Sequence, residues 1–322
     1  MTGKGCILTG ILCLLSGTAR ADSLGLKEIE RLNLLCRPTQ IVFAGDTDAI
    51  AASGNGRIFY RRNGGHWETS PVETKGGRAL VRLPDGRWLI CDTENRRLLL
   101  VSDLSGKEAA TPVSALGGIT LERPLDILME PGTPFIWLLD SGHRVFRFTS
   151  VDSPATVLQF HHPQEIGDPR GLSFFDGRLH IIDSSRGEVM RIDDFWDRRY
   201  TVFRAPRPPG TPRDVPAGSM STTGPVLNDV QKIGEWYYGS DFFSPTYAKG
   251  GDITPGRLLR WRNWKDFQSG KWEDVTPLLP GGDVRVTPFF LTAHNDSLYI
   301  PYFDGESPCS GGGVLFMAGA GE

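Results

Sequence analysis

A four-residue pattern that recurs six times constrains this chain more than any other feature. In four copies, proline is the first residue, the next two residues vary, and the fourth is aliphatic. Two copies without proline fill the gaps between them. The copies are Pro38–Ile41, Gly77–Leu80, Pro124–Ile127, Pro169–Leu172, Leu227–Val230 and Pro288–Leu291. Their third residues are 40, 79, 126, 171, 229 and 290, so successive copies lie 39, 47, 45, 58 and 61 residues apart. A repeat of this period predicts a fold built from similar units.

The residues after each copy repeat as well. In the second copy, a turn leads into the apolar run Trp88–Cys91, then Asp92 and a short loop, then a second apolar run that ends at Leu100. The later copies carry the same aspartate as Asp140, Asp183, Asp241 and Asp304, whereas the first copy has Ser53. Units of this length, each holding several short strands, are typical of propeller blades. The sequence therefore predicts an all-β protein, a six-bladed β-propeller.

Composition and charge agree with this prediction and exclude one class of partner. The chain has 39 Gly and 23 Pro among 322 residues, which suits many short strands joined by turns. The formal net charge is −3, whereas non-specific nucleic-acid binders present a strongly basic surface. We therefore expect no nucleic-acid partner.

The first 21 residues have the pattern of a secretory signal peptide. Lys4 precedes an apolar run from Cys6 to Leu15, and small residues precede the expected cleavage after Ala21. The run is shorter than the roughly 20 apolar residues that cross a bilayer, so we expect no membrane span. Removal of residues 1–21 would leave 33 basic and 38 acidic side chains, a net charge of −5. This pattern predicts a secreted or periplasmic protein; the alternative is a buried N-terminal helix.

Residues 22–35 are expected to precede the propeller, which we assign to residues 36–322. Ile29, Leu32 and Leu35 have helical spacing. The segment is either a short helix or the outer strand of the last blade, and the sequence leaves both open.

One repeat carries a resemblance to a known family. The run Asp92–Arg97 resembles an NHL repeat, and the chain from about Cys36 to its C-terminus is similar to six-bladed propellers of the NHL, gluconolactonase-like and paraoxonase-like superfamily. The resemblance implies the fold but not one activity, because this superfamily includes lactonases, lyases and binding modules. We expect the repeated aspartate to be structural, since its short side chain accepts hydrogen bonds from nearby backbone N–H groups.

Three cysteines remain after removal of the signal peptide. Cys91 lies inside a strand-like run and is expected to be a buried free thiol. The topology that the resemblance implies puts Cys36 and Cys309 on the same face, beside the seam between the last and first blades. An oxidising compartment would allow them to form a disulfide that closes the ring.

The same topology implies that ligands bind on this face. Two long insertions, Arg204–Val226 and Ser240–Gly256, would lie there, although simple tolerance of insertions is the alternative. The second residues of the six copies would form a ring at this end of the channel: Thr39, Arg78, Leu125, Arg170, Asn228 and Phe289.

Two arginines in this ring suggest an anionic ligand. The guanidinium groups of Arg78 and Arg170 match carboxylate or phosphate geometry. The alternative is an internal salt bridge to Asp126 or Asp229. His143, His161 and His162 are expected on the same rim, where a histidine could act as a general base or simply be solvated.

A metal site is the competing hypothesis. Asn228 and the residues after it resemble the paraoxonase segment that supplies an Asn ligand to calcium. The candidate ligands are Asn228, Asp229, Asp126 and Gln40, a small set for an ion that takes six to eight oxygens. The sequence thus favours a binding protein for a small anionic molecule or an extracytoplasmic protein; the alternative is a metal-dependent lactonase, esterase-like hydrolase or lyase at the channel mouth.

Overall fold

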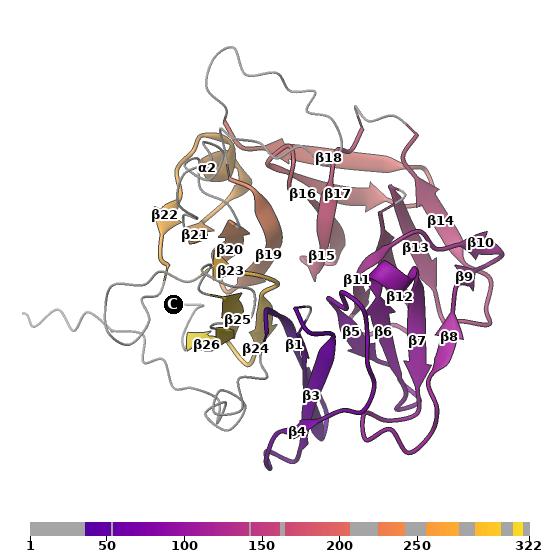
Figure 1. The fold of residues 1–322 in the computed structure, drawn as a ribbon. Helices are drawn as coiled ribbons and strands as arrows, with labels where there is room; N and C mark the ends of the chain where they lie inside the picture. The colour runs from indigo at the N-terminus through magenta and orange to yellow at the C-terminus, as the bar shows by residue number, and fades with distance from the viewer. Residues whose placement is uncertain are drawn as a thin grey trace, which may run out of the picture.

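The computed structural model describes residues 36–52, 54–141, 143–161, 165–206, 225–241, 256–276, 287–303 and 312–317. These residues form six four-stranded sheets arranged in a ring, with the first strand of each sheet nearest the centre (Figure 1). The prediction of a six-bladed β-propeller is confirmed. Among the described residues, no helix is long and apolar enough to cross a membrane.

In blades 1 to 5 the strands follow one another from the centre of the ring outward, and each pairs antiparallel with the next. Blade 1 consists of β1 (Pro38–Ala44), β2 (Thr47–Ala52), β3 (Arg57–Arg62) and β4 (Glu68–Thr69). Blade 2 consists of β5 (Leu80–Arg82), β6 (Trp88–Asp92), β7 (Arg97–Val101) and β8 (Thr111–Val113), with the 3-10 turn η1 (Thr93–Asn95) between β6 and β7.

Blades 3 and 4 have the same order. Blade 3 consists of β11 (Pro124–Met129), β12 (Ile136–Asp140), β13 (Arg144–Phe148) and β14 (Thr156–Gln159), and is preceded by a hairpin of β9 (Ala115–Leu116) and β10 (Ile119–Thr120). Blade 4 consists of β15 (Pro169–Phe175), β16 (Arg178–Asp183), β17 (Glu188–Asp194) and β18 (Arg199–Arg204).

Blades 5 and 6 depart from the pattern in two places. Blade 5 consists of β19 (Leu227–Ile233), β20 (Trp236–Asp241), β21 (Arg257–Trp261) and β22 (Glu273–Asp274), with helix α2 (Trp264–Gln268) between the last two. In blade 6, β23 (Thr287–Pro288) and β24 (Thr292–His294) form the inner edge in two pieces, both paired with β25 (Ser297–Phe303), which pairs in turn with β26 (Gly312–Met317). Residues 22–35 lie outside the described residues, so their role in this blade stays a prediction.

The hydrophobic core lies between the blades. The buried apolar side chains of the described residues form six clusters, and each cluster joins two neighbouring blades. The last cluster joins blade 6 to blade 1, with Tyr299 and Val314 packed against Ile41 and Phe59. Burial of apolar surface therefore stabilises the interface between blades 6 and 1, which closes the ring, as it does the other interfaces between blades.

The repeated tetrad forms a β-bulge at the start of the inner strand. The pairing register of β1, β11, β15 and β19 shifts at the tetrad's second residue, which lies between two paired residues. Proline suits the first position because it lacks an N–H and is tolerated at the first residue of a strand or at a bulge. A bulge redirects the side chain that it holds. The bulged residues are Thr39, Leu125, Arg170 and Asn228.

The aspartate that ends the second strand is structural, as predicted. Asp140 accepts hydrogen bonds from the backbone N–H groups of Glu122 and Arg123, which lead into the inner strand of the same blade. It also forms a salt bridge with Arg144, the first residue of the third strand. The corresponding residues Asp92, Asp183 and Asp241 also accept N–H groups from the segment before their own inner strands. Asp304 lies outside the described residues.

The cysteine predictions have different outcomes. Cys91 is a buried free thiol in β6, as predicted, and burial raises its pKa well above the ordinary value. Cys309 lies outside the described residues. Its pairing with Cys36 therefore stays a prediction.

Candidate functional site

Residues that are neighbours in the tetrad separate into two levels of the central channel. A cavity of about 290 Å³ is lined by the third residues Gln40, Asp126 and Asp229 and by residues that follow them along the inner strands. None of the six second residues lines this cavity. The lining continues to Pro131 and His294, toward the turns that join the first and second strands. Arg78 and Arg170 lie instead toward the loops between blades. The expected single site is therefore divided between two levels: the cavity, and the region around Arg78 and Arg170, which we call the arginine level.

The third residues connect neighbouring blades. The side-chain oxygen of Gln40 accepts the backbone N–H of Leu80 at 2.8 Å. In the same way, Asp126 accepts the N–H of Leu172 at 2.7 Å, and Asp229 accepts that of Leu291 at 2.8 Å. In each pair, the donor is the fourth tetrad residue of the next blade. These hydrogen bonds join blade 1 to 2, blade 3 to 4 and blade 5 to 6.

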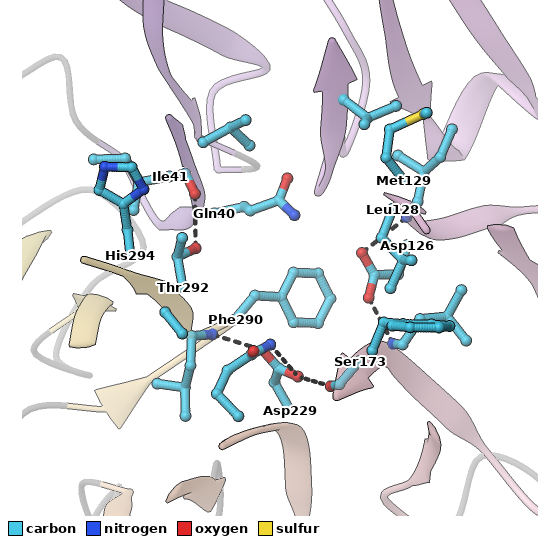
Figure 2. A pocket seen from close by; sticks show the side chains of 18 of the residues that line it. Gln40, Ile41, Asp126, Leu128, Met129, Ser173, Asp229, Phe290, Thr292 and His294 are labelled. Atoms are coloured by element: carbon cyan, nitrogen blue, oxygen red, sulfur yellow. Dashed lines mark hydrogen bonds between the residues drawn. The ribbon is translucent and has the colours of Figure 1, made fainter. Parts of the chain in front are cut away.

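Asp229 has the larger hydrogen-bond network. Its carboxylate also accepts the Ser173 hydroxyl at 2.6 Å (Figure 2). It further accepts the backbone N–H of Val230 at 2.7 Å and the side-chain amide of Gln231 at 3.2 Å. The side chain is buried, with 2% of its surface exposed. Burial is the main influence and raises the pKa of Asp229 to about 6, although the hydrogen bonds act in the opposite direction.

Asp126 points into the same cavity from the other side (Figure 2). It also accepts the N–H of Ile127 at 2.8 Å. Burial, followed by the negative charge of Asp229, raises the pKa of Asp126 well above its ordinary value. The two carboxylates therefore face one cavity in an environment that favours their protonated forms.

At the other level, Arg170 has a partner that the sequence did not predict. Its guanidinium forms a salt bridge with Asp168 at 2.7 Å, two residues earlier in the chain, with both side chains about one quarter exposed. For Arg170, the alternative of a salt bridge to Asp126 or Asp229 is therefore wrong. The bulge at Arg170 places its side chain near the blade connection, whereas the third residues face the cavity.

Arg78 lies close to Arg170. Burial, followed by the positive charges of Arg170 and Arg123, lowers the pKa of Arg78 to about 10, although Asp168 and Glu94 act in the opposite direction. Within the part of the chain that the structure describes, no carboxylate is within salt-bridge distance of the Arg78 guanidinium. Three arginines thus share one region with two carboxylates. One of these, Asp168, is already paired with Arg170.

Asn228 belongs to the same level by its place in the repeat. Its side chain is 5% exposed, and its amide Nδ2 has no hydrogen-bond partner among the described residues. Its backbone carbonyl lies against Gly171, where an added Cβ would come within 2.2 Å of the oxygen. A buried amide without an acceptor is uncommon in a folded protein and indicates a position where a further acceptor fits.

The structure describes two of the three candidate histidines. The Nε2 atom of His143 lies 3.0 Å from the backbone carbonyl of Gly167, next to Asp168. His161 is exposed, and its backbone N–H donates to the carboxylate of Glu165. His162 lies outside the described residues. A role for any of them as a general base stays untested.

The proposed metal ligands do not form one set. Gln40, Asp126 and Asp229 line the cavity, but Asn228 does not. Each of the three already uses an oxygen to accept a backbone N–H of the next blade. Among the described residues, no group of three or more His, Cys, Asp or Glu side chains is arranged to hold a metal ion. These donors therefore fit poorly with a calcium ion, which takes six to eight oxygens.

Sequence reasoning missed several residues of both levels. Ser173 and Gln231 contact Asp229 from positions that carry no repeat signal, and Thr292 donates to the backbone carbonyl of Ile41 across the seam between blades 6 and 1. Asp168 and Arg123 precede their tetrads by one residue. A comparison of the residues before each proline would have identified them as neighbours of the arginine level.

The comparisons with known proteins identify the fold. No family model matches the chain, and no curated protein matches it. A streptogramin B lyase structure is similar, with a TM-score of 0.54, 11% identity and coverage of 88% of this chain and 83% of that one. A catalytically inactive variant of virginiamycin B lyase from Staphylococcus aureus with quinupristin has a TM-score of 0.52 and 15% identity, with coverage of 88% of this chain and 85% of that one. The structure of U3-55K has a TM-score of 0.52 and 10% identity, with coverage of 84% of this chain and 75% of that one.

The protein has the β-propeller fold. At identities of 10 to 15%, these similarities extend to the fold and not to an activity. They support the resemblance drawn from the repeat, at the level of architecture.

Proposed function

We propose that this propeller is an exported binding protein that recognises an anionic group at the level of Arg78 and Arg170. The observation that carries the proposal is the Arg78 guanidinium, which is partly withdrawn from water beside two other arginines and has no described carboxylate as a partner. A desolvated cation without a counter-ion is costly, and an anionic ligand would remove that cost.

Two further observations support this proposal. Arg170 is held by Asp168, which fixes the direction of its guanidinium. Asn228 supplies an amide donor that lacks an acceptor among the described residues. A planar guanidinium and an amide together suit the oxygens of a carboxylate or phosphate group.

Titration of the full-length chain with inorganic phosphate and with citrate tests the proposal. Arg78→Ala should weaken binding roughly ten- to a hundredfold, because a charge-assisted bidentate contact contributes about 1.5–3 kcal/mol. Arg78→Lys should restore only part of the affinity, since it keeps the charge but loses the planar fork. Arg178→Ala is the matched control, because Arg178 is exposed at the start of β16, among the turns that join first and second strands. Equal affinity of Arg78→Ala and the unaltered protein would reject the proposal.

The competing function is a metal-dependent lactonase, esterase-like hydrolase or lyase. Two of the similar structures are lyases, which favours this alternative only at the level of the fold. Calcium is its expected cofactor. The test is thermal unfolding with calcium and with a chelator, and a calcium-dependent rise in melting temperature would support the alternative.

Export is part of the proposal and rests on residues 1–21. N-terminal sequencing of protein expressed from the full-length gene, with cell fractionation, tests it. A new N-terminus at Asp22 in the secreted or periplasmic fraction would support export, and a cell-associated chain that retains Met1 would contradict it.

A further inference from the structure

The cavity beside Asp126 and Asp229 has an unusual charge balance. Neither carboxylate forms a salt bridge within the described structure, and no Lys or Arg is among the described residues that line the cavity. The only other titratable side chain in this described lining is His294, which stacks on Phe43 with ring centroids 4.4 Å apart. Buried carboxylates are normally paired. Without a cation this environment favours their protonated forms, and a bound cation would favour the charged forms instead.

The rest of the lining is mainly apolar and aromatic. Phe290 extends into the middle of the cavity near both carboxylates (Figure 2), and Phe174 and Phe43 also contribute to the wall. Aromatic faces attract organic cations, and apolar walls favour the hydrocarbon part of a ligand. A small inorganic ion would gain nothing from such walls.

We infer that this cavity is a second ligand site, separate from the arginine level, and that it takes an organic ammonium compound with a short apolar body. The ammonium group would lie between Asp126 and Asp229. The apolar body would pack against Phe290 and the aliphatic residues at the ends of the inner strands. The volume of about 290 Å³ suits a small molecule of this kind.

The oxygens of Asp126 retain the capacity to bind such a group. Those of Asp229 already accept hydrogen bonds from Ser173, Val230, Gln231 and Leu291, so Asp229 would contribute its charge. Each oxygen of Asp126 accepts one backbone N–H, and a carboxylate oxygen has two lone pairs. One ammonium donor could therefore be shared with the carboxylate without breaking the contact between blades 3 and 4. Gln40 presents its side chain to the same space, as Figure 2 shows.

Ligand-observed NMR on the full-length chain at neutral pH tests this inference with butylammonium as the probe and 1-butanol as its uncharged analogue. Butylammonium should show saturation transfer, and butanol should not. Asp126→Asn should weaken butylammonium binding at least tenfold, because it removes one charge but keeps an acceptor for the Leu172 N–H. Asp152→Asn removes an exposed carboxylate outside the cavity and should leave binding unchanged.

A second variant keeps the inference testable if Asp126→Asn folds poorly. Ala293 lines the cavity but is exposed, so Ala293→Trp should narrow the entrance without disturbing the blade, and should also weaken binding at least tenfold. Equal binding of butylammonium and butanol, or equal binding to the unaltered protein and Ala293→Trp, would overturn the inference. Absence of any butylammonium binding would also overturn it and leave the carboxylates as links between blades.

Discussion

The carboxylate of Asp126 in blade 3 accepts a hydrogen bond of 2.7 Å from the backbone N–H of Leu172 in blade 4. Gln40 and Asp229 make the same contact with the blades that follow theirs. The intervening third residues cannot do so. Ala79 has no side-chain acceptor, and Gly171 lies so close to the Asn228 carbonyl that an added Cβ would come within 2.2 Å. The third residues thus link alternate interfaces of the ring, whereas other side chains link the remaining ones, as Ser173 does to Asp229 between blades 4 and 5.

The first prediction concerns this link. Asp126→Ala leaves the N–H groups of Leu172 and Ile127 without their acceptor, so the free energy of unfolding should fall by about 2 kcal/mol. Asp126→Asn keeps an acceptor oxygen and should stay within about 1 kcal/mol of the unaltered protein. Urea unfolding at neutral pH measures both. Equal stability of the two variants would show that water in the cavity replaces the carboxylate.

The second prediction concerns pH. The folded state raises the pKa of Asp229 from 3.8 to about 6, so the folded protein binds this proton more tightly than the unfolded chain. The resulting stabilisation is complete below pH 4 and is lost as the pH rises through 6, with an upper magnitude of about 3 kcal/mol. Asp126 acts in the same direction.

Comparison with Asp229→Asn isolates that contribution. The difference in unfolding free energy between the two proteins should change between about pH 4.5 and 7.5, in favour of the variant at the higher pH. Asp152→Asn, with an exposed carboxylate, is the control and should show no such trend. A constant difference across this range would mean that Asp229 titrates as it does in the unfolded chain.

The third prediction compares two salt bridges. Arg144 is 11% exposed and its partner Asp140 is fully buried, so Arg144→Ala should lower the free energy of unfolding by about 3 kcal/mol. Arg170 and Asp168 are 27% and 22% exposed, so Arg170→Ala should cost less than about 1 kcal/mol. Chemical denaturation of both variants checks the order. A larger loss for Arg170→Ala would indicate that Arg170 is part of the scaffold.

The fourth prediction concerns thiols. Cys91 is fully buried and its pKa is raised, so it should react with a thiol reagent only after unfolding. If Cys36 and Cys309 form the predicted disulfide, the mature protein should show no reactive thiol when native and one in denaturant. Two thiols that react rapidly in the native protein would reject the pairing.

The repeat determined the number of blades and most strand positions, because strand alternation and turn residues are local properties of the chain. The predicted apolar run Trp88–Cys91 and the aspartate after it together form strand β6, Trp88–Asp92. The structural role of the aspartate at the end of the second strand was also predictable, since its hydrogen-bond donors precede the inner strand of the same blade. Local patterns of this kind do not depend on the rest of the ring.

Only the tertiary structure decided where the candidate site residues lie relative to one another. Asp229 follows Asn228 directly, yet only Asp229 lines the cavity, because the bulge at Asn228 changes the direction of its side chain. Two partners of Asp229 come from other blades, Ser173 from blade 4 and Leu291 from blade 6, through contacts that no spacing in the sequence encodes. The charge of the two carboxylates depends on that assembly, since burial between blades, and not the residue type, raises their pKa.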